Sequence, residues 1–215
     1  MTAQTYALLQ SDAAAALQRT DLTARIVEFI SNAEFKIARS IRPRGFERYT
    51  TSTFVAGSAG AVVDQPARLM GMISWYALAD SAGTATGSIR YPVRRRSYSF
   101  CRAYNPNTST TGRPLFWADA GDAQFLVAPS PSVAFTFELN YYERLAPLSA
   151  SNTTNWLTDN CPQLLLYASL LESAPYLRDD ERIAVWQAQY ETHVAAITAV
   201  ESMFDTADAD VPRKQ

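Results

Sequence analysis

Few side chains in this sequence have the types and spacing that catalysis or metal binding requires. His193 is the only histidine, so any Ser-His, Cys-His or histidine-ligated metal site would have to use it. Its place on an apolar stripe favours a packed histidine over a catalytic one. Cys101 and Cys161 are far apart and outside the CxxC spacing of a metal or redox site. We therefore expect two free thiols and no metal.

Acidic and glycine-containing motifs could also carry chemistry. The Asp-Asp-Glu run at 179–181 could serve glycoside hydrolysis or Mg²⁺ binding, but acids in the first turn of a helix already stabilise its dipole. Asp119 and Asp122 flank a glycine in a predicted hairpin turn, where Asp is common. The G-S-A-G at 57–60 lacks the Lys-Ser/Thr pair of a phosphate loop. These patterns predict no catalytic residue and no cofactor, and they indicate a protein that is not an enzyme.

The segment Arg90–Tyr104 is the strongest candidate for an interaction site. Its sequence R-Y-P-V-R-R-R-S-Y-S-F-C-R-A-Y interleaves five arginines with four aromatic residues. It could bind phosphates and stack bases, form a protein–protein hot spot, or be a solvated basic face beside a β-core. We favour the protein interface, with contacts from Arg94, Arg95, Arg96, Tyr98 and Arg102.

Composition limits the partners of the chain. A net charge of −2, with no matching basic stripe elsewhere, argues against a dedicated polyanion binder. Of the 19 basic residues 17 are arginine, which suits fixed bidentate contacts at interfaces, although a GC-rich genome would have the same effect. The length allows one large or two small domains. Neither a signal peptide nor a membrane span is evident, so we expect a soluble protein made in the cytoplasm, with no membrane partner.

The N-terminal residues have helical periodicity. A helix is expected over 5–18, followed by a stronger one capped by Thr20 and Asp21. Arg42-Pro43 ends the second helix, because the residue before proline disfavours the α region. Its buried face is predicted from apolar residues at helical spacing: Leu22, Ile26, Phe29, Ile30, Ala33 and Ile37.

The middle of the chain is rich in Thr, Ser, Val and aromatic residues and predicts strands. We expect loops over 56–64 and 80–87, and a short basic helix over Pro92–Ala103. The predicted strands are Glu47–Val55, Leu69–Leu78, Leu115–Ala118, Gln124–Val127 and Val133–Tyr142.

Helical periodicity returns after Pro147. Residues 149–154 offer N-cap oxygens before Trp156, and Pro162 fits the first position of a buried helix that Pro175 stops. The last helix carries two apolar rows, Ile183, Tyr190, Ile197 and Phe204 beside Trp186, His193 and Val200. Trp186 and Tyr190 are expected to pack the helical core or a seam between subunits. The residues after Phe204 lack periodicity and predict a flexible tail.

The order helix, helix, strands, helix, helix predicts an α+β fold. A helical bundle would be built from both termini, with an antiparallel β-domain inserted between them. We expect domain limits of 1–41 and 148–204 for the bundle, 42–147 for the β-rich domain, and 205–215 for the tail.

Three segments carry a resemblance to a known family. They are L-Q-R-T-D-L-T-A-R-I-V-E-F-I-S-N-A-E-F-K-I-A-R at 17–39, the strand-rich stretch at 112–142, and L-S-A-S-N-T-T-N-W-L with the following helix at 148–182. The chain resembles the adaptor, or head-to-tail connector, proteins of tailed bacteriophages, especially short-tailed ones. Residues 56–111 match no pattern of that family.

The resemblance implies a non-enzymatic virion protein, with copies forming a ring expected to be twelvefold beneath the portal. The ring would link the portal to tail nozzle or fibre proteins, and the genome would pass through its channel at DNA ejection without sequence recognition. Arg94, Arg95, Arg96 and Arg102 would then contact a neighbouring subunit, a tail protein or DNA. Portal binding would fall to Val211, Pro212, Arg213 and Lys214.

Two alternatives from other classes stay open. A single-stranded nucleic-acid-binding protein would use Arg90–Tyr104 and show steeply salt-dependent affinity. A carbohydrate-active or virion-associated hydrolase would need a perturbed carboxylate pair in a pocket.

Overall fold

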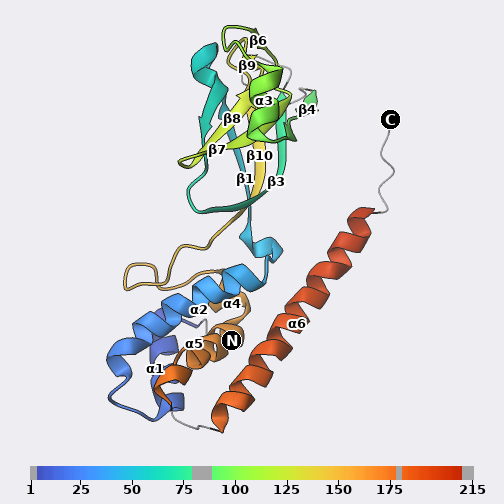
Figure 1. The fold of residues 1–215 in the computed structure, drawn as a ribbon. Helices are drawn as coiled ribbons and strands as arrows, with labels where there is room; N and C mark the ends of the chain where they lie inside the picture. The colour runs from blue at the N-terminus through green and yellow to red at the C-terminus, as the bar shows by residue number, and fades with distance from the viewer. Residues whose placement is uncertain (1–3, 79–88, 178–180, 210–215) are drawn as a thin grey trace. The chain divides into compact units, whose positions relative to one another are not determined.

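The computed structural model describes residues 4–78, 89–177 and 181–209. The chain divides into two compact units, each described here by itself (Figure 1). The helical unit comprises Met1–Phe46 and Leu145–Gln215, and the β unit comprises Glu47–Arg144. The expected α+β class is confirmed. The finer domain limits at 41, 147 and 204 stay a prediction.

The first part of the helical unit contains α1 (Tyr6–Leu17) and α2 (Ile26–Ser40). Thr5 caps α1 by accepting a hydrogen bond from the Leu8 amide at 3.3 Å. The predicted capping of α2 by Thr20 and Asp21 is wrong, because the Asp21 carboxylate binds the Arg19 guanidinium and a 3₁₀ turn, η1 (Thr23–Arg25), precedes α2. All six residues predicted for the buried face of this helix are buried, but Leu22 precedes α2, and only Ile26, Phe29, Ile30, Ala33 and Ile37 lie on it.

The second part begins with α4 (Trp156–Asn160), which Asn155 rather than a residue of 149–154 caps. The Asn155 side chain accepts from the Leu157 and Thr158 amides, and Thr158 completes a capping box. Pro162 opens α5 (Pro162–Glu172) as predicted, and Leu164, Leu165 and Ala168 are fully buried. The 3₁₀ turn η4 (Ala174–Tyr176) then ends this helix at Pro175.

The last helix, α6 (Arg182–Ala209), ends five residues beyond the predicted end at Phe204, and among its described side chains only Trp186 and Tyr190 are fully buried. Trp186 and Tyr190 are 6% and 7% exposed, whereas Ile197 is half-buried and Val200 is 52% exposed. At 1.5 Å rise per residue, α5 is about 16 Å long and α6 about 42 Å. Because α6 packs on α5 and far outruns it, the predicted seam cannot be covered throughout. Asp179 and Asp180, expected in its first turn, lie outside the described residues.

The β unit contains two four-stranded sheets and one short strand pair (Figure 1). The first sheet has the antiparallel order β1 (Glu47–Thr53), β10 (Thr136–Glu143), β3 (Leu69–Leu78), β4 (Arg90–Pro92). The second has the order β2 (Val62–Asp64), β8 (Gln124–Ala128), β7 (Phe116–Gly121), β5 (Arg94–Arg95). β6 (Thr111–Gly112) pairs with β9 (Ser130–Pro131). The pairs β5–β7 and β6–β9 are parallel, so the inserted domain is not wholly antiparallel as predicted.

Two local predictions in the β unit are wrong in part. The expected loop over 56–64 contains β2, which pairs with β8 through Val62 and Leu126. The helix expected over Pro92–Ala103 begins only at Tyr98, as α3 (Tyr98–Tyr104). Arg94 and Arg95 instead form β5, held by the main chain of β7. The other expected loop, 80–87, lies outside the described residues.

The core of the β unit lies between its two sheets. Trp75 on β3 and Phe137 on β10 meet Trp117 on β7 and Phe125 on β8, and Phe125 has no exposed surface. The apolar side chains at every second position of β10, Phe137, Leu139 and Tyr141, are all in this core. The turn between β7 and β8 has three successive residues at positive φ, Gly121, Asp122 and Ala123.

Candidate interaction surfaces

The residues considered for catalysis are distributed over the molecule and engaged elsewhere. His193 is half-buried on α6, where its ring stacks on Tyr167 of α5 at 5.9 Å. Asp119 binds Arg95 at 2.6 Å. Over residues 4–78, 89–177 and 181–209 no group of three or more His, Cys, Asp or Glu side chains could hold a metal ion. None of the described helices is long and apolar enough to cross a membrane.

The two cysteines are free thiols in different units, as predicted. Cys101 is 1% exposed beneath α3, and Cys161 is partly buried between α4 and α5. Burial raises the pKa of both thiols. Because the thiolate is the reactive form, neither cysteine has the environment of a nucleophile.

Arg90, the first arginine of the basic segment, has a half-exposed side chain with a structural role. From β4 its guanidinium reaches across β3 to the Glu138 carboxylate on β10, with Nε–Oε2 at 2.7 Å and Nη2–Oε1 at 2.9 Å. Glu138 is only 5% exposed. Hydrogen bonding from Arg90 is the largest influence on Glu138 and lowers the pKa of its carboxyl. This bidentate pair fixes β4 to the centre of the first sheet.

Replacing Glu138 with glutamine is expected to lower the melting temperature at neutral pH, because Arg90 then loses a charged bidentate partner. Since the folded-state pKa of Glu138 lies below its ordinary value of 4.5, the pair stabilises the fold above that pH. Its contribution disappears as pH falls through the folded-state pKa. Thermal unfolding of the original chain and of the Glu138→Gln variant, measured across this pH range, should therefore show that the difference between their melting temperatures disappears in acid. Asp122→Asn, in an exposed turn, is the matched control. A difference in melting temperature that does not change with pH would contradict a stabilising Arg90–Glu138 ion pair.

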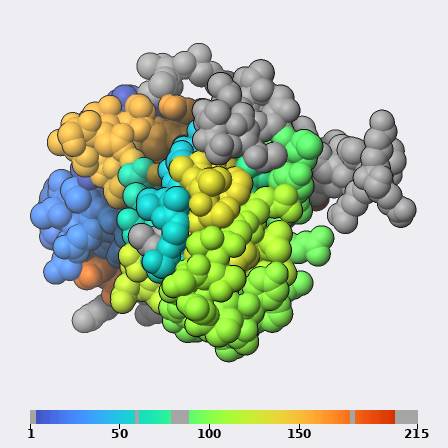
Figure 2. Space-filling model, turned by 90° about the horizontal axis from the view of Figure 1, so that it is seen from above, coloured from blue at the N-terminus to red at the C-terminus, as the bar shows by residue number. Residues whose placement is uncertain are grey.

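Most of the remaining basic segment forms an exposed surface around α3. We define the α3 surface as Arg94, Arg96, Tyr98, Phe100, Arg102 and Tyr104. Ser97 caps the helix by accepting from the Phe100 amide at 3.2 Å. Cys101 points inward, while Tyr98, Phe100 and Tyr104 are 45%, 40% and 48% exposed. The part of the chain that contains α3, green in Figure 2, lies at the surface of the β unit.

The aromatic side chains of the α3 surface hold one another in place. Phe100 and Tyr104 stack at 6.0 Å, and both meet the ring of Phe116 on β7 edge-on, at 5.1 and 5.0 Å. Arg96 lies over Phe116 at 5.6 Å, and Arg102 lies 5.1 Å from the centre of the Tyr98 ring. Arginine and tyrosine presented on a rigid support are typical of interface hot spots.

Arg95 has a different environment from its neighbours. Its guanidinium binds Asp119 and lies over Trp117, 5.4 Å from the ring centre. Of the interface residues predicted in this segment, Arg94, Arg96, Tyr98 and Arg102 are all exposed, and Arg102 contacts Tyr98. Arg95 is tied to β7. Sequence reasoning missed Phe116, which supports the α3 surface from another strand, and no sequence signal marks it.

The other predicted contact residues lie in the helical unit. Trp186 and Tyr190 are buried in the isolated chain, Arg182 lies over Trp186 at 5.3 Å, and the Tyr190 hydroxyl is 3.3 Å from Ser40 Oγ. Beyond them an apolar hollow of about 490 Å³ runs along α6. It is lined by Ser40, Tyr190, Val194, Ala195, Thr198 and Ala199, among others. The predicted portal-binding residues, Val211, Pro212, Arg213 and Lys214, lie outside the described residues.

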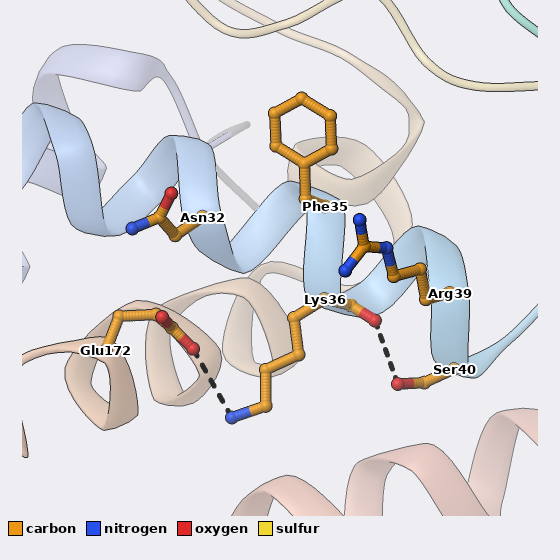
Figure 3. A pocket seen from close by; sticks show the side chains of 6 residues that line it. All are labelled: Asn32, Phe35, Lys36, Arg39, Ser40 and Glu172. Atoms are coloured by element: carbon orange, nitrogen blue, oxygen red, sulfur yellow. Dashed lines mark hydrogen bonds and ion pairs between the residues drawn. The ribbon is translucent and has the colours of Figure 1, made fainter.

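A second hollow on the helical unit, of about 580 Å³, is lined mostly by residues with polar or charged side chains (Figure 3). It is formed by α2 and the end of α5. Lys36 and Glu172 face one another at 3.4 Å, while the Phe35 ring points away from them (Figure 3). Ser40 closes the helix end by donating to the Lys36 carbonyl at 2.8 Å. This arrangement is an ion pair on a surface and lacks the paired carboxylates or nucleophile that hydrolysis would need.

Comparison with known proteins identifies a family whose description, adaptor protein, agrees with a protein that works through binding surfaces. A family model described as SU10 adaptor protein matches residues 4–213, which include nearly all of both units. No curated protein matches the sequence.

Proposed function

Since the chain belongs to the SU10 adaptor protein family, a family of phage adaptor proteins, we propose that it is a head-to-tail connector of a tailed-phage virion. Copies form a ring beneath the portal, expected to be twelvefold, and join it to tail nozzle or fibre proteins. The genome passes through the channel without sequence recognition when DNA is ejected. A structural role of this kind requires binding surfaces and no catalytic residue.

The family match over residues 4–213 is the observation that carries this proposal. Two structural features support it. The exposed half of α6 offers an apolar hollow for another helix or subunit, and the α3 surface offers arginines and aromatic rings. Each copy thus has different binding surfaces on its two units, and contacts between unlike surfaces close into rings when the rotation allows it.

The decisive experiment mixes the purified chain with the portal ring encoded beside it and measures the mass and symmetry of the product. One adaptor per portal subunit, in a stable complex, is the expected result. Two separate species from intact proteins would overturn the connector assignment.

The C-terminal residues provide a sharper prediction. Deletion of 211–215 removes Val211, Pro212, Arg213 and Lys214, and we expect it to abolish the portal complex, because these residues are proposed to order in a groove of the portal. The free chain should keep its thermal stability. Mass measurement of the mixture tests whether the portal complex is lost. Val185→Ala, a substitution at an exposed position on α6, is the control and should bind the portal normally. A truncated chain that still forms the full complex would assign portal binding to another surface.

A further inference from the structure

Three arginines of the α3 surface, Arg94, Arg96 and Arg102, have no carboxylate partner within the described part of the chain. Arg96 donates to the Arg95 carbonyl at 3.2 Å, and Arg102 Nε donates to the Tyr98 hydroxyl at 3.0 Å. A guanidinium has five N–H groups, so most donors of all three remain available. They lie within a stretch of nine residues, 94–102.

The charge of the β unit leaves these arginines uncompensated. Residues 47–144 contain nine arginines and seven acidic residues, a net charge of +2, although the whole chain has a net charge of −2. Three of these carboxylates form ion pairs with arginines outside the α3 surface. Glu138 pairs with Arg90, Glu143 pairs with Arg48 and Arg68, and Asp119 pairs with Arg95. Among the residues that the structure describes, no carboxylate therefore pairs with an arginine of the α3 surface.

The aromatic rings of the surface favour a protein partner over a nucleic acid. Bases stack on free ring faces, but Arg102 lies over Tyr98, and Phe100 and Tyr104 stack on one another. Each of these rings thus has a face engaged within the α3 surface, and the guanidinium groups of Arg94, Arg96 and Arg102 are exposed beside them. Carboxylates bind guanidinium N–H groups in bidentate geometry, and apolar side chains pack well on ring edges.

We propose that the α3 surface binds an acidic segment of a neighbouring virion protein. Carboxylates of that segment pair with Arg94, Arg96 and Arg102, and its apolar side chains contact Tyr98, Phe100 and Tyr104. This inference rests on the proposed function, because a connector places such a neighbour next to the β unit. It identifies the chemistry of the partner, which is an acidic peptide with apolar residues between its carboxylates.

The test measures binding of the full chain to three probes at low salt by fluorescence anisotropy. The probes are a short labelled peptide of glutamates and tyrosines, the same peptide with glutamine for glutamate, and oligothymidylate. We expect the glutamate peptide to bind most tightly. Arg94→Gln, Arg96→Gln and Arg102→Gln should each weaken it about two- to fivefold, as exposed ion pairs do, and the triple variant by roughly ten- to a hundredfold. Arg39→Gln, an exposed arginine of the helical unit, is the matched control.

Three outcomes overturn the inference. They are tighter binding of oligothymidylate than of the glutamate peptide, equal binding of the glutamine peptide, and an unchanged affinity in a triple variant with a normal circular dichroism spectrum. The portal complex is measured in parallel with the same proteins. Portal binding without peptide binding refutes the acidic partner alone, whereas peptide binding without a portal complex keeps the α3 surface and refutes the connector.

Discussion

Replacing Trp186 with alanine is expected to lower the free energy of unfolding by about 3–5 kcal/mol, the usual cost of deleting a buried tryptophan. Trp186 is 6% exposed on the half of α6 that packs against α5. Its ring also lies under the Arg182 guanidinium at 5.3 Å. The substitution removes the larger of the two buried aromatic side chains described on α6 and leaves a cavity that the surrounding structure closes only in part. Denaturant titration of the purified chain measures the loss.

The matched control for this substitution is Val185→Ala. Val185 is the preceding residue on the same helix but is 59% exposed, so its truncation should change stability by no more than about 0.5 kcal/mol. Unchanged stability of the Trp186 variant together with loss of ring assembly would contradict core packing. It would assign Trp186 to a seam between subunits instead.

The sequence predicted those elements whose burial follows a simple period. The buried face of α2 recurs every three to four residues, and β10 alternates apolar side chains with others. In both, one local pattern specifies the type of element and the face that is buried. Pro162 likewise marked the first residue of α5, because a missing N–H costs nothing there.

Elements that depend on distant partners could not be predicted in this way. β2 has three residues and exists because Val62 pairs with Leu126. β5 has two residues and pairs with β7, which shortens the helix expected over Pro92–Ala103. Such short segments contain too few residues for a period to be detected. The end of α6 and the exposure of Val200 on its seam depend similarly on the length of α5.

The composition of Arg90–Tyr104 was enough to locate the candidate site, but it could not predict the role of each residue in it. Five arginines in Arg90–Tyr104 look equivalent in the sequence. The structure separates them because Glu138 binds Arg90 and Asp119 binds Arg95, from strands 48 and 24 residues away. Only folding reveals which arginines are already paired, and hence which can bind a partner.

Replacing Phe125 with alanine is expected to destabilise the β unit by about 3–5 kcal/mol. Phe125 has no exposed surface, and its ring meets Trp117 edge-on at 4.9 Å and Trp75 at 5.3 Å. Aromatic pairs of this geometry add roughly 0.5–1.5 kcal/mol each beyond the buried area. The two tryptophans belong to different sheets and also contact each other, with ring centres 5.8 Å apart. Phe125 is therefore one of the contacts through which the sheets pack, and its loss loosens both.

Tryptophan fluorescence during denaturant unfolding measures this effect, because Trp75 and Trp117 report directly on the space that the substitution opens. Val55→Ala is the matched control in the β unit, since Val55 is 62% exposed and should lose no more than about 0.5 kcal/mol. A Phe125 variant as stable as the control would show that the two sheets are held together by other contacts. The α3 surface depends on β7 and the core beneath it, so the destabilised variant should also bind the acidic peptide more weakly at temperatures where the β unit begins to unfold.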